Sequence, residues 1–448
     1  MLPLFDYAAE IIPKEYHATT GVYYQATAGM RLLEESEQEH VYDALYDGLI
    51  QEESFVFRGI QRKDFATLSG EMEAYYGALA ANFLQGIIDT ELRVLSAQNS
   101  LETPDHPIGA LDMGGSSTQI VYIANQEDEE TESPTTSPPG ATMCPVKPQP
   151  LSSHDQSDEI ENTCRLSDEH FFSTSYLSYG VDQIRKRLWT TLVEESKDAQ
   201  RVSNPCANKG YEVEFKGRTL VGTGNTNECT RQMQRLIPHP DVVQDWDADV
   251  ESWTVGGVEH PPIRGKFLAM SLYFFALDSL RVFSKPKQDA HVRLNETWPN
   301  PSIQELQDAL DGLCSRDWRG DMELQEGVHT FTRKEVLPHR CLETVYMVTL
   351  LKDGFGFDPS SRDITFTFLI DGDEVEWTLG MALAMNANEQ TATAATTVTT
   401  TNFDNVYNIN ETGNNLIFEL EDQQVENYRM RVPIAHSFGV TMPPTHCC

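Results

Sequence analysis

The amino-acid sequence predicts an α/β protein with two lobes, and three observations favour this fold class. The chain has 448 residues, and a single hydrophobic core usually splits into domains beyond roughly 250 to 300 residues. A strand-like run at 22–26 leads through an Ala-Gly turn into apolar residues at helical spacing up to Leu49. Two further strand-like runs, 108–113 and 119–123, are joined around a Gly-Gly turn and lie between stretches of helical pattern.

Helical patterns and strand-like alternation continue along the chain. Apolar residues at helical spacing occur at 73–88, 181–193 and 265–283, and strand-like alternation occurs at 364–370. The third helical pattern contains the longest apolar run, which carries Asp278 and is too short to span a bilayer. We therefore interpret that run as a core helix.

Two segments lack the pattern of a packed core. Residues 125–162 are acidic and rich in Ser, Thr and Pro, which is typical of a solvated insertion. Residues 390–402 are rich in Thr and Asn, which is typical of a linker. The final segment, 406–448, gives no predicted fold.

The charge of the chain limits its partners. With 69 acidic and 33 basic side chains, the formal net charge is -36. Such a surface repels nucleic acid and anionic lipid, so we expect no nucleic-acid partner. A phosphate-bearing small molecule would need a divalent cation or a nest of backbone N–H groups in order to bind.

The cysteines indicate disulfides in an oxidising compartment. None of the eight cysteines lies in the CxxC spacing of a zinc or thioredoxin-like site. Asn295 and Asn410 each begin an N-x-Thr triplet that can accept an N-glycan. The first residues lack the basic start and apolar run of a signal peptide. We therefore expect the N-terminus of the gene product to lie upstream of Met1.

The segment 109–120, G-A-L-D-M-G-G-S-S-T-Q-I, carries the strongest local signal for chemistry. A carboxylate such as Asp112 at a strand end can hold a metal-bound water, and a turn at Gly114 and Gly115 lets backbone N–H groups approach phosphate oxygens. Ser117 and Gln119, beyond the turn, would orient a water. A plain hairpin with a glycine turn explains this segment equally well when it is considered alone.

Two motifs in order resemble those of the apyrases, the ecto-nucleoside triphosphate diphosphohydrolase family. A-T-A-G-M-R-L-L at 26–33 matches the second apyrase motif, and the Asp112 segment matches the fourth. Residues 70–84 resemble the third motif, with Ala74 and Ala78 where the family usually has Gly and Trp. Weaker matches follow in family order, and the resemblance covers roughly residues 1–385. These weaker matches are at 175–180, 204–206, 222–225, 265–273, 354–357 and 377–380.

The resemblance implies an actin-like fold, in which two ribonuclease-H-like lobes enclose a nucleotide and Mg²⁺ or Ca²⁺ in a cleft. The first lobe would span 1–89 with a return segment at about 373–388, and the second would span 90–372, followed by the linker and tail at 389–448. The implied reaction is hydrolysis of the terminal phosphate of nucleoside tri- or diphosphates. The implied location is the Golgi or endoplasmic-reticulum lumen or the cell exterior, with a membrane anchor in some full-length forms.

The resemblance also assigns roles to individual residues. The implied general base is Glu73, and the implied water-positioning groups are Ser117 and Gln119. The implied phosphate-binding residues are Gly114, Gly115, Ser116 and Ala28. The implied metal-binding residues are Asp112 and, through water, Thr27, and the implied nucleobase contact is Tyr273. Without the resemblance, a helical Glu is usually solvent-facing and an aromatic in so apolar a helix is usually a core residue.

The disulfide pairs implied by the resemblance are Cys206 with Cys229 and Cys314 with Cys341. A further pair, Cys144 with Cys164, would close the insertion, and Cys447 and Cys448 have no assigned partner. An exopolyphosphatase-like phosphatase is an alternative within the same superfamily, but it would not be expected to carry the Cys206 and Cys314 landmarks.

No segment matches the first apyrase motif, D-x-G-S-S/T, which lies upstream of the second motif and supplies the other phosphate hairpin. We therefore expect a first lobe that is truncated at its N-terminus. Two hypotheses remain open. In the first, the complete gene encodes a working hydrolase and this chain alone has little activity; in the second, the chain is a non-catalytic nucleotide-binding or structural protein.

Overall fold

The computed structural model describes residues 2–95, 106–123, 165–197, 199–238, 254–285 and 290–388, with backbone only for 290–293. Several predictions fall outside these ranges: the insertion at 125–162, the tail after 388, and the residues Asn410, Cys144, Cys164, Cys447 and Cys448. None of the helices in the described ranges is both long and apolar enough to cross a membrane.

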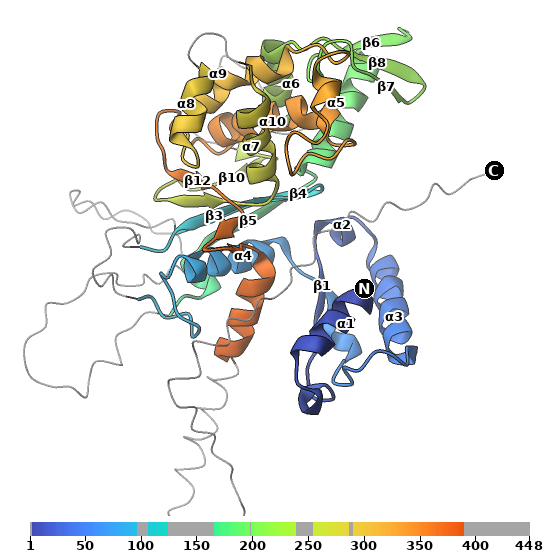
Figure 1. Cartoon of the computed structure of the whole chain (residues 1–448), viewed down its shortest axis with the longest axis vertical. Helices are drawn as coiled ribbons and strands as arrows, with labels where there is room; N and C mark the ends of the chain where they lie inside the picture. Colours follow the sequence, from blue (N-terminus) through green and yellow to red (C-terminus); the bar gives the residue numbers. More distant parts are fainter. Residues whose placement is uncertain are drawn as a thin grey trace, which may run out of the picture.

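A five-stranded mixed sheet lies at the centre of the structure (Figure 1). The strands, in spatial order, are β12 (Ile364–Phe366), β11 (Phe267–Ala269), β3 (Gly109–Met113), β4 (Ser117–Tyr122) and β5 (Phe172–Leu177). The pairs β3–β4 and β4–β5 are antiparallel, whereas β11 runs parallel to both of its neighbours. The two strands predicted around the Gly-Gly turn are thus confirmed as the β3–β4 hairpin.

The alternation of side chains along these strands creates two separate cores. Leu111 and Ile120 contribute to one hydrophobic cluster, and Ala110 and Val121 contribute to another. Because successive side chains of a strand point to opposite faces, each central strand stabilises both layers that cover the sheet.

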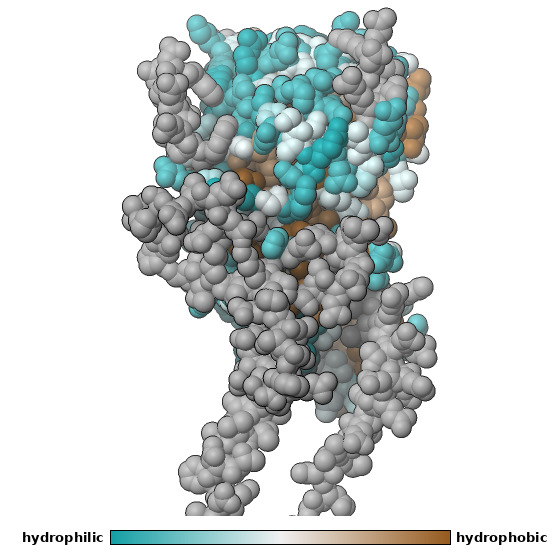
Figure 2. All heavy atoms as spheres, turned by 90° about the vertical axis from the view of Figure 1, so that its left-hand side faces the viewer, coloured by the Kyte–Doolittle hydropathy of each residue, from teal (hydrophilic) through white to brown (hydrophobic). Residues whose placement is uncertain are grey.

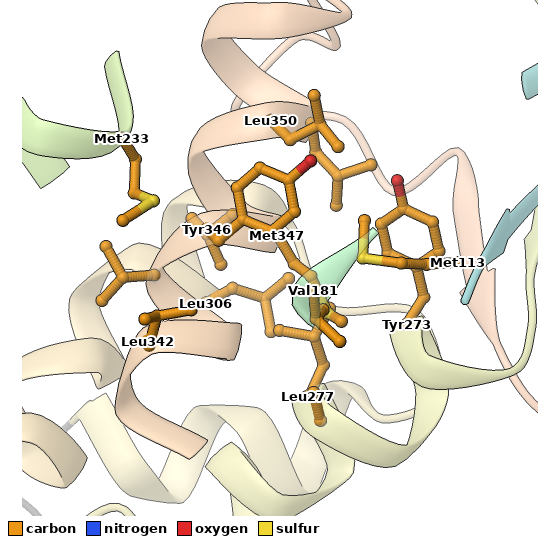
Figure 3. Packing of buried hydrophobic residues seen from close by; sticks show 14 of the residues in the cluster. Met113, Val181, Met233, Tyr273, Leu277, Leu306, Leu342, Tyr346, Met347 and Leu350 are labelled. Carbon is orange, nitrogen blue, oxygen red and sulfur yellow. The ribbon is translucent and has the colours of Figure 1, made fainter. Parts of the chain in front are cut away.

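A layer of helices covers the first face. Its helices are α5 (Val181–Glu195), α6 (Thr226–Leu236), α7 (Leu272–Phe283), α8 (Ala290–Thr297), α9 (Ile303–Cys314) and α10 (Arg340–Thr349). Side chains from α7, α9 and α10 form one hydrophobic cluster with Met113 of the sheet (Figure 3). The upper part of the molecule is mostly hydrophilic on its surface, with hydrophobic atoms in the band below it (Figure 2). The disulfides Cys206–Cys229 and Cys314–Cys341 are both formed, which confirms these two pairs.

Two helices cover the second face, α4 (Gly70–Leu84) and a helix at 377–388 that returns from the end of the described chain (Figure 1). Ala74 and Ala78 of α4 are buried in the core that α4 shares with this helix and the sheet. The two helices approach closely, because a Cβ atom on Gly380 would lie 1.8 Å from the carbonyl oxygen of Tyr76. Only glycine fits at this contact.

The N-terminal residues form a smaller unit with its own core around Tyr42, Phe55 and Phe65. Its elements are α1 (Leu2–Ile11), β1 (Tyr24–Ala26), α2 (Ala28–Arg31), α3 (Glu35–Gln51) and β2 (Phe65–Thr67), with β1 and β2 parallel. The predicted strand-turn-helix unit is present, but its helix is divided in two. The division arises because Glu34 and Glu37 form a capping box that begins α3.

Small sheets and short helices complete the structure. A three-stranded sheet consists of β6 (Arg201–Asn204), β8 (Arg218–Gly222) and β7 (Glu212–Phe215). Two hairpins pair β9 (Thr254–Val255) with β10 (Val258–Glu259), and β13 (Leu369–Ile370) with β14 (Asp373–Glu374). Short 3₁₀ helices occur at Lys14–Tyr16, Arg62–Asp64, Asp168–His170, Met322–Gln325 and Leu337–His339, and a π-helical turn occurs at Leu350–Gly354.

The predicted helix at 265–283 is wrong in its first part. Phe267–Ala269 forms β11, and α7 begins only after Ser271, whose backbone has φ 53° and ψ -130°. A strand that is buried on both faces consists of consecutive apolar residues, and so does a segment of a buried helix. Composition therefore does not distinguish the two in this run. The mixed α/β architecture nevertheless confirms the predicted fold class. The domain boundaries at 89 and 372 remain a prediction.

Candidate active site

A row of polar side chains crosses the sheet on the face that α4 covers. Asp112 of β3 pairs directly with Gln119 of β4, and Gln119 pairs with Ser175 of β5. Ser117, two residues before Gln119 in the same strand, points to the same face. These residues alternate in sequence with core residues of the other face, so the strand period alone brings the polar groups together.

Glu73 faces this row from the first turn of α4. The helix begins at Ser69, whose hydroxyl accepts a hydrogen bond from the Met72 backbone N–H at 3.2 Å. Ala74 is buried beside Glu73, and Glu73 itself is only 7% exposed. The helix therefore directs this carboxylate to the sheet rather than to solvent.

Gln119 connects the carboxylate to the strands. Its side-chain Nε2 lies 3.1 Å from Oε2 of Glu73, 2.6 Å from Oγ of Ser117 and 3.0 Å from Oγ of Ser175. The structure thus brings together the predicted residues Glu73, Ser117 and Gln119.

Arg31 is a further member of the site that the sequence interpretation missed. Its Nη2 lies 2.7 Å from Oε2 of Glu73 and 3.3 Å from Oγ of Ser117, and its Nη1 donates to the Leu68 carbonyl oxygen at 2.8 Å. In the sequence Arg31 lies in the segment 26–33 that resembles the second apyrase motif, but the resemblance was not used to assign it a role. No local signal connects it to a glutamate on another helix.

The electrostatics of the site are dominated by carboxylates. Burial, followed by repulsion from the nearby Asp112, raises the pKa of Glu73 to about 7, against the opposing effect of Arg31. Burial also raises the pKa of Asp112, against hydrogen bonds from the Ser271 side chain and the Met113 backbone. Glu376 was likewise missed by the sequence interpretation; burial, followed by repulsion from Asp112 and Glu374, raises its pKa to about 7.

The turn after β3 presents backbone N–H groups on one side. The carbonyl groups of Gly114, Gly115 and Ser116 accept hydrogen bonds from Val181, Asp182 and Ser178 respectively, at 3.1, 2.9 and 2.8 Å. In a trans peptide the next N–H points opposite to the carbonyl group. The N–H groups of residues 115–117 therefore point away from residues 178–182, and within the described residues none of them donates a hydrogen bond to a backbone carbonyl group. Such a row of free donors fits phosphate oxygens.

Close packing holds this turn in place. A Cβ atom on Gly180, which precedes α5, would lie 2.3 Å from the carbonyl carbon of Gly115. The start of α5 can thus contact the turn backbone directly.

The remaining predicted residues are not brought into this cluster. Thr27 precedes α2 and Ala28 is buried at its start, one helical turn from Arg31. Within the described residues, no backbone hydrogen bond joins either residue to Asp112 or to the glycine turn. Their metal and phosphate roles therefore remain predictions.

The prediction that Tyr273 contacts a nucleobase is wrong. Tyr273 is 0% exposed, and its hydroxyl lies 3.1 Å from that of Thr118 inside the core. It packs near Met113 among core residues (Figure 3). Helix α7 is mostly apolar and packs between the sheet and the other helices, so this tyrosine is a core residue.

The carboxylate of Asp112 is the group of this site that fits a divalent cation. Within the described residues, no group of three or more His, Cys, Asp or Glu side chains is arranged to chelate a metal. The carboxylate of Asp112 has no cationic side chain among the groups that perturb its pKa. A hydrated cation would supply this missing positive charge, and Mg²⁺ typically binds through one or two carboxylates, waters and substrate phosphates.

Comparison with known proteins gives three findings. Residues 1–399 match the GDA1/CD39 (nucleoside phosphatase) family. The chain is 27% identical over 408 residues to ectonucleoside triphosphate diphosphohydrolase 8 of Gallus gallus, covering 85% of this chain and 70% of that protein. It is 24% identical over 416 residues to the Golgi apyrase of Saccharomyces cerevisiae, covering 85% of this chain and 58% of that protein.

A solved structure shares the fold. The crystal structure of a nucleoside triphosphate hydrolase from Neospora caninum aligns with a TM-score of 0.54 and 14% sequence identity. The alignment covers 83% of this chain and 73% of the other chain. This similarity supports the two-lobed α/β fold.

Proposed function

Because the chain belongs to the GDA1/CD39 nucleoside phosphatase family, we propose that the protein hydrolyses the terminal phosphate of nucleoside tri- or diphosphates. One observation carries this proposal: Glu73 of α4 lies beside Ser117 and Gln119. Both of these residues belong to β4, the strand that begins directly after the glycine turn. A proton acceptor, water-positioning groups and free backbone N–H groups that can bind phosphate are thus close to one another.

The hydrogen bonds indicate which oxygen of Glu73 acts as the base. Arg31 and Gln119 both donate to Oε2. Among the described residues no hydrogen-bond donor reaches Oε1, which is free to accept a proton from water. Ser117 accepts hydrogen bonds from Gln119 and Arg31, so its own hydroxyl hydrogen is available to the same water.

The chemistry requires alignment more than covalent help. The attacking oxygen must lie in line with the leaving oxygen while negative charge spreads over the phosphoryl group. The N–H groups of residues 115–117 would receive that charge, and Glu73 would remove the proton of the water. Bound Mg²⁺ or Ca²⁺, held through water by Asp112 and Thr27, would neutralise phosphate charge.

We further propose the lumen of the secretory pathway or the cell exterior as the place of action. The two disulfides fit an oxidising compartment. Asn295 is exposed on α8, which suits an N-glycan acceptor. The matched relatives include a Golgi enzyme and proteins named as ectoenzymes.

The direct test is phosphate release by the purified protein, with ATP, ADP, GDP and UDP as substrates and with Mg²⁺, Ca²⁺ or a chelator. We expect cation-dependent release that Glu73→Gln abolishes while nucleotide binding persists. Glu71→Gln, which changes an exposed carboxylate of the same helix, is the matched control. Full activity of Glu73→Gln would remove this residue from its role. Nucleotide binding without release by the unmodified protein would favour the non-catalytic alternative.

A further inference from the structure

Arg31 belongs to the small N-terminal unit, yet its guanidinium group reaches the polar row of the central sheet. We propose that Arg31 is a positioning residue for hydrolysis: it holds Glu73 and Ser117 so that Oε1 of Glu73 faces the attacking water. This inference rests on the proposed function and assigns a role to a residue outside the set predicted from sequence.

Three hydrogen-bond acceptors from three different segments of the chain hold the guanidinium group of Arg31. They are the Leu68 carbonyl oxygen before α4, Oε2 of Glu73 in α4 and Oγ of Ser117 in β4, at 2.8, 2.7 and 3.3 Å. A guanidinium group is planar and presents its donors in a rigid fork, so three such contacts set both its position and its plane. The side chain is 14% exposed.

The direction of these hydrogen bonds follows from the chemistry of arginine. Because a guanidinium group only donates, Oε2 and Oγ must both accept. Glu73 therefore keeps Oε1 for water, and Ser117 keeps its hydroxyl hydrogen for the same water. Without Arg31, Oε2 would retain only the hydrogen bond from Gln119.

The charges that face Glu73 make Arg31 difficult to replace. Asp112 from β3 repels the carboxylate, and Arg31 from α2 is the cation that opposes this repulsion. The side chains that β4 and β5 direct to this site, Gln119 and Ser175, are uncharged. Loss of Arg31 would thus leave the carboxylate both less anchored and repelled.

The experiment compares Arg31→Ala and Arg31→Lys with Arg62→Ala in the purified protein. Arg62 belongs to the same N-terminal unit but pairs with the exposed carboxylates of Glu39 and Asp43. We expect Arg31→Ala to lower kcat by roughly 10²-fold with little change in KM, since a small misplacement of catalytic groups has a cost of this order. Arg31→Lys should lie between Arg31→Ala and the unmodified protein, because an ammonium group cannot span all three acceptors. Arg62→Ala should keep its activity.

Guanidinium rescue separates positioning from general support of the fold. Added guanidinium ion, well below denaturing concentrations, should restore part of the kcat of Arg31→Ala but none of the kcat of Glu73→Gln. Thermal unfolding of each variant is measured in parallel. Undiminished kcat in Arg31→Ala, an effect on KM alone, or a loss that follows the unfolding temperature without rescue would each overturn the inference.

A double-mutant cycle adds a second measurement. If Arg31 acts through Ser117, the loss caused by Arg31→Lys should be smaller in the Ser117→Ala background than in the unmodified protein. Simple additivity would contradict the proposed link. Failure of the proposed function would look different, because Glu73→Gln would then be active or no form of the protein would release phosphate.

Discussion

The two faces of the central sheet use the same strands for different purposes. On one face, Leu111 and Ile120 pack under a layer of helices that two disulfides brace. On the other face, their sequence neighbours Asp112 and Gln119 form a polar row under α4. The difference shows that adjacent residues of one strand can have separable roles: Leu111 and Ile120 serve packing alone, whereas the opposite face combines a second core with the polar row.

The largest expected effect is on the apolar face. Leu111→Ala should lower the free energy of unfolding by about 2 to 5 kcal/mol, because Leu111 is fully buried and its truncation leaves a cavity. Chemical denaturation measures this loss. Since the side chain points away from the polar row, kcat of the folded variant should be unchanged. A reduced kcat at low temperature would contradict the separation of the two faces.

On the polar face, Gln119→Leu should lower kcat by roughly 10- to 100-fold, because Glu73, Ser117 and Ser175 all lose a shared donor. Steady-state phosphate release measures the effect. Val121→Ala changes a residue two positions along the same face and serves as the control. An equal loss of kcat in both variants would mean that packing, rather than the hydrogen bonds, sets the rate.

The pH dependence should report the buried carboxylate. Because the pKa of Glu73 is raised to about 7, the rate should rise with pH through this region as the base loses its proton. The folded state also binds this proton more tightly than the unfolded state, whose glutamate titrates near 4.5. Protonated Glu73 therefore contributes at most about 3 kcal/mol to the free energy of unfolding. This contribution is fully present below about pH 4.5 and is lost as the pH rises through about 7.

The comparison that isolates this effect is denaturation across pH for the unmodified protein and Glu73→Gln. The difference in unfolding free energy between them should move in favour of the variant as the pH rises from about 4.5 to about 8. A pH-independent difference would show that Glu73 titrates near its ordinary value.

The smallest expected effect concerns Tyr273. Tyr273→Phe removes one hydroxyl contact with Thr118 and should lower the unfolding free energy by only about 1 kcal/mol. Because the ring is buried, KM for every nucleotide should stay the same. A raised KM would restore Tyr273 as a nucleobase contact.

The sequence predicted the β3–β4 hairpin correctly because a local pattern of two strands around a glycine turn indicates it. It also placed Glu73 correctly on a helix, because a helical pattern and a motif match cover this residue. The strand period then explains why Asp112, Ser117 and Gln119 share a face. Arg31 and Glu376 were missed because their partners come from distant parts of the chain and leave no periodic signal.

Two errors have a common physical cause. The run that contains β11 and α7 is mostly apolar and mostly buried, so its composition distinguishes neither strand from helix nor cleft from core. As a result, Phe267–Ala269 was interpreted as helical and Tyr273 as accessible. In such a run too few polar residues distinguish an exposed face from a buried one, and both interpretations depend on that distinction.

The contact between Gly380 and Tyr76 has a consequence for biosynthesis. The helix at 377–388 forms part of the core beneath the polar row, and Glu376 immediately before it lies near Asp112. A ribosome delivers α4 and the hairpin long before this helix. The nascent chain must therefore keep the apolar underside of α4 protected, by a chaperone or by transient contacts, until translation has passed Gly380.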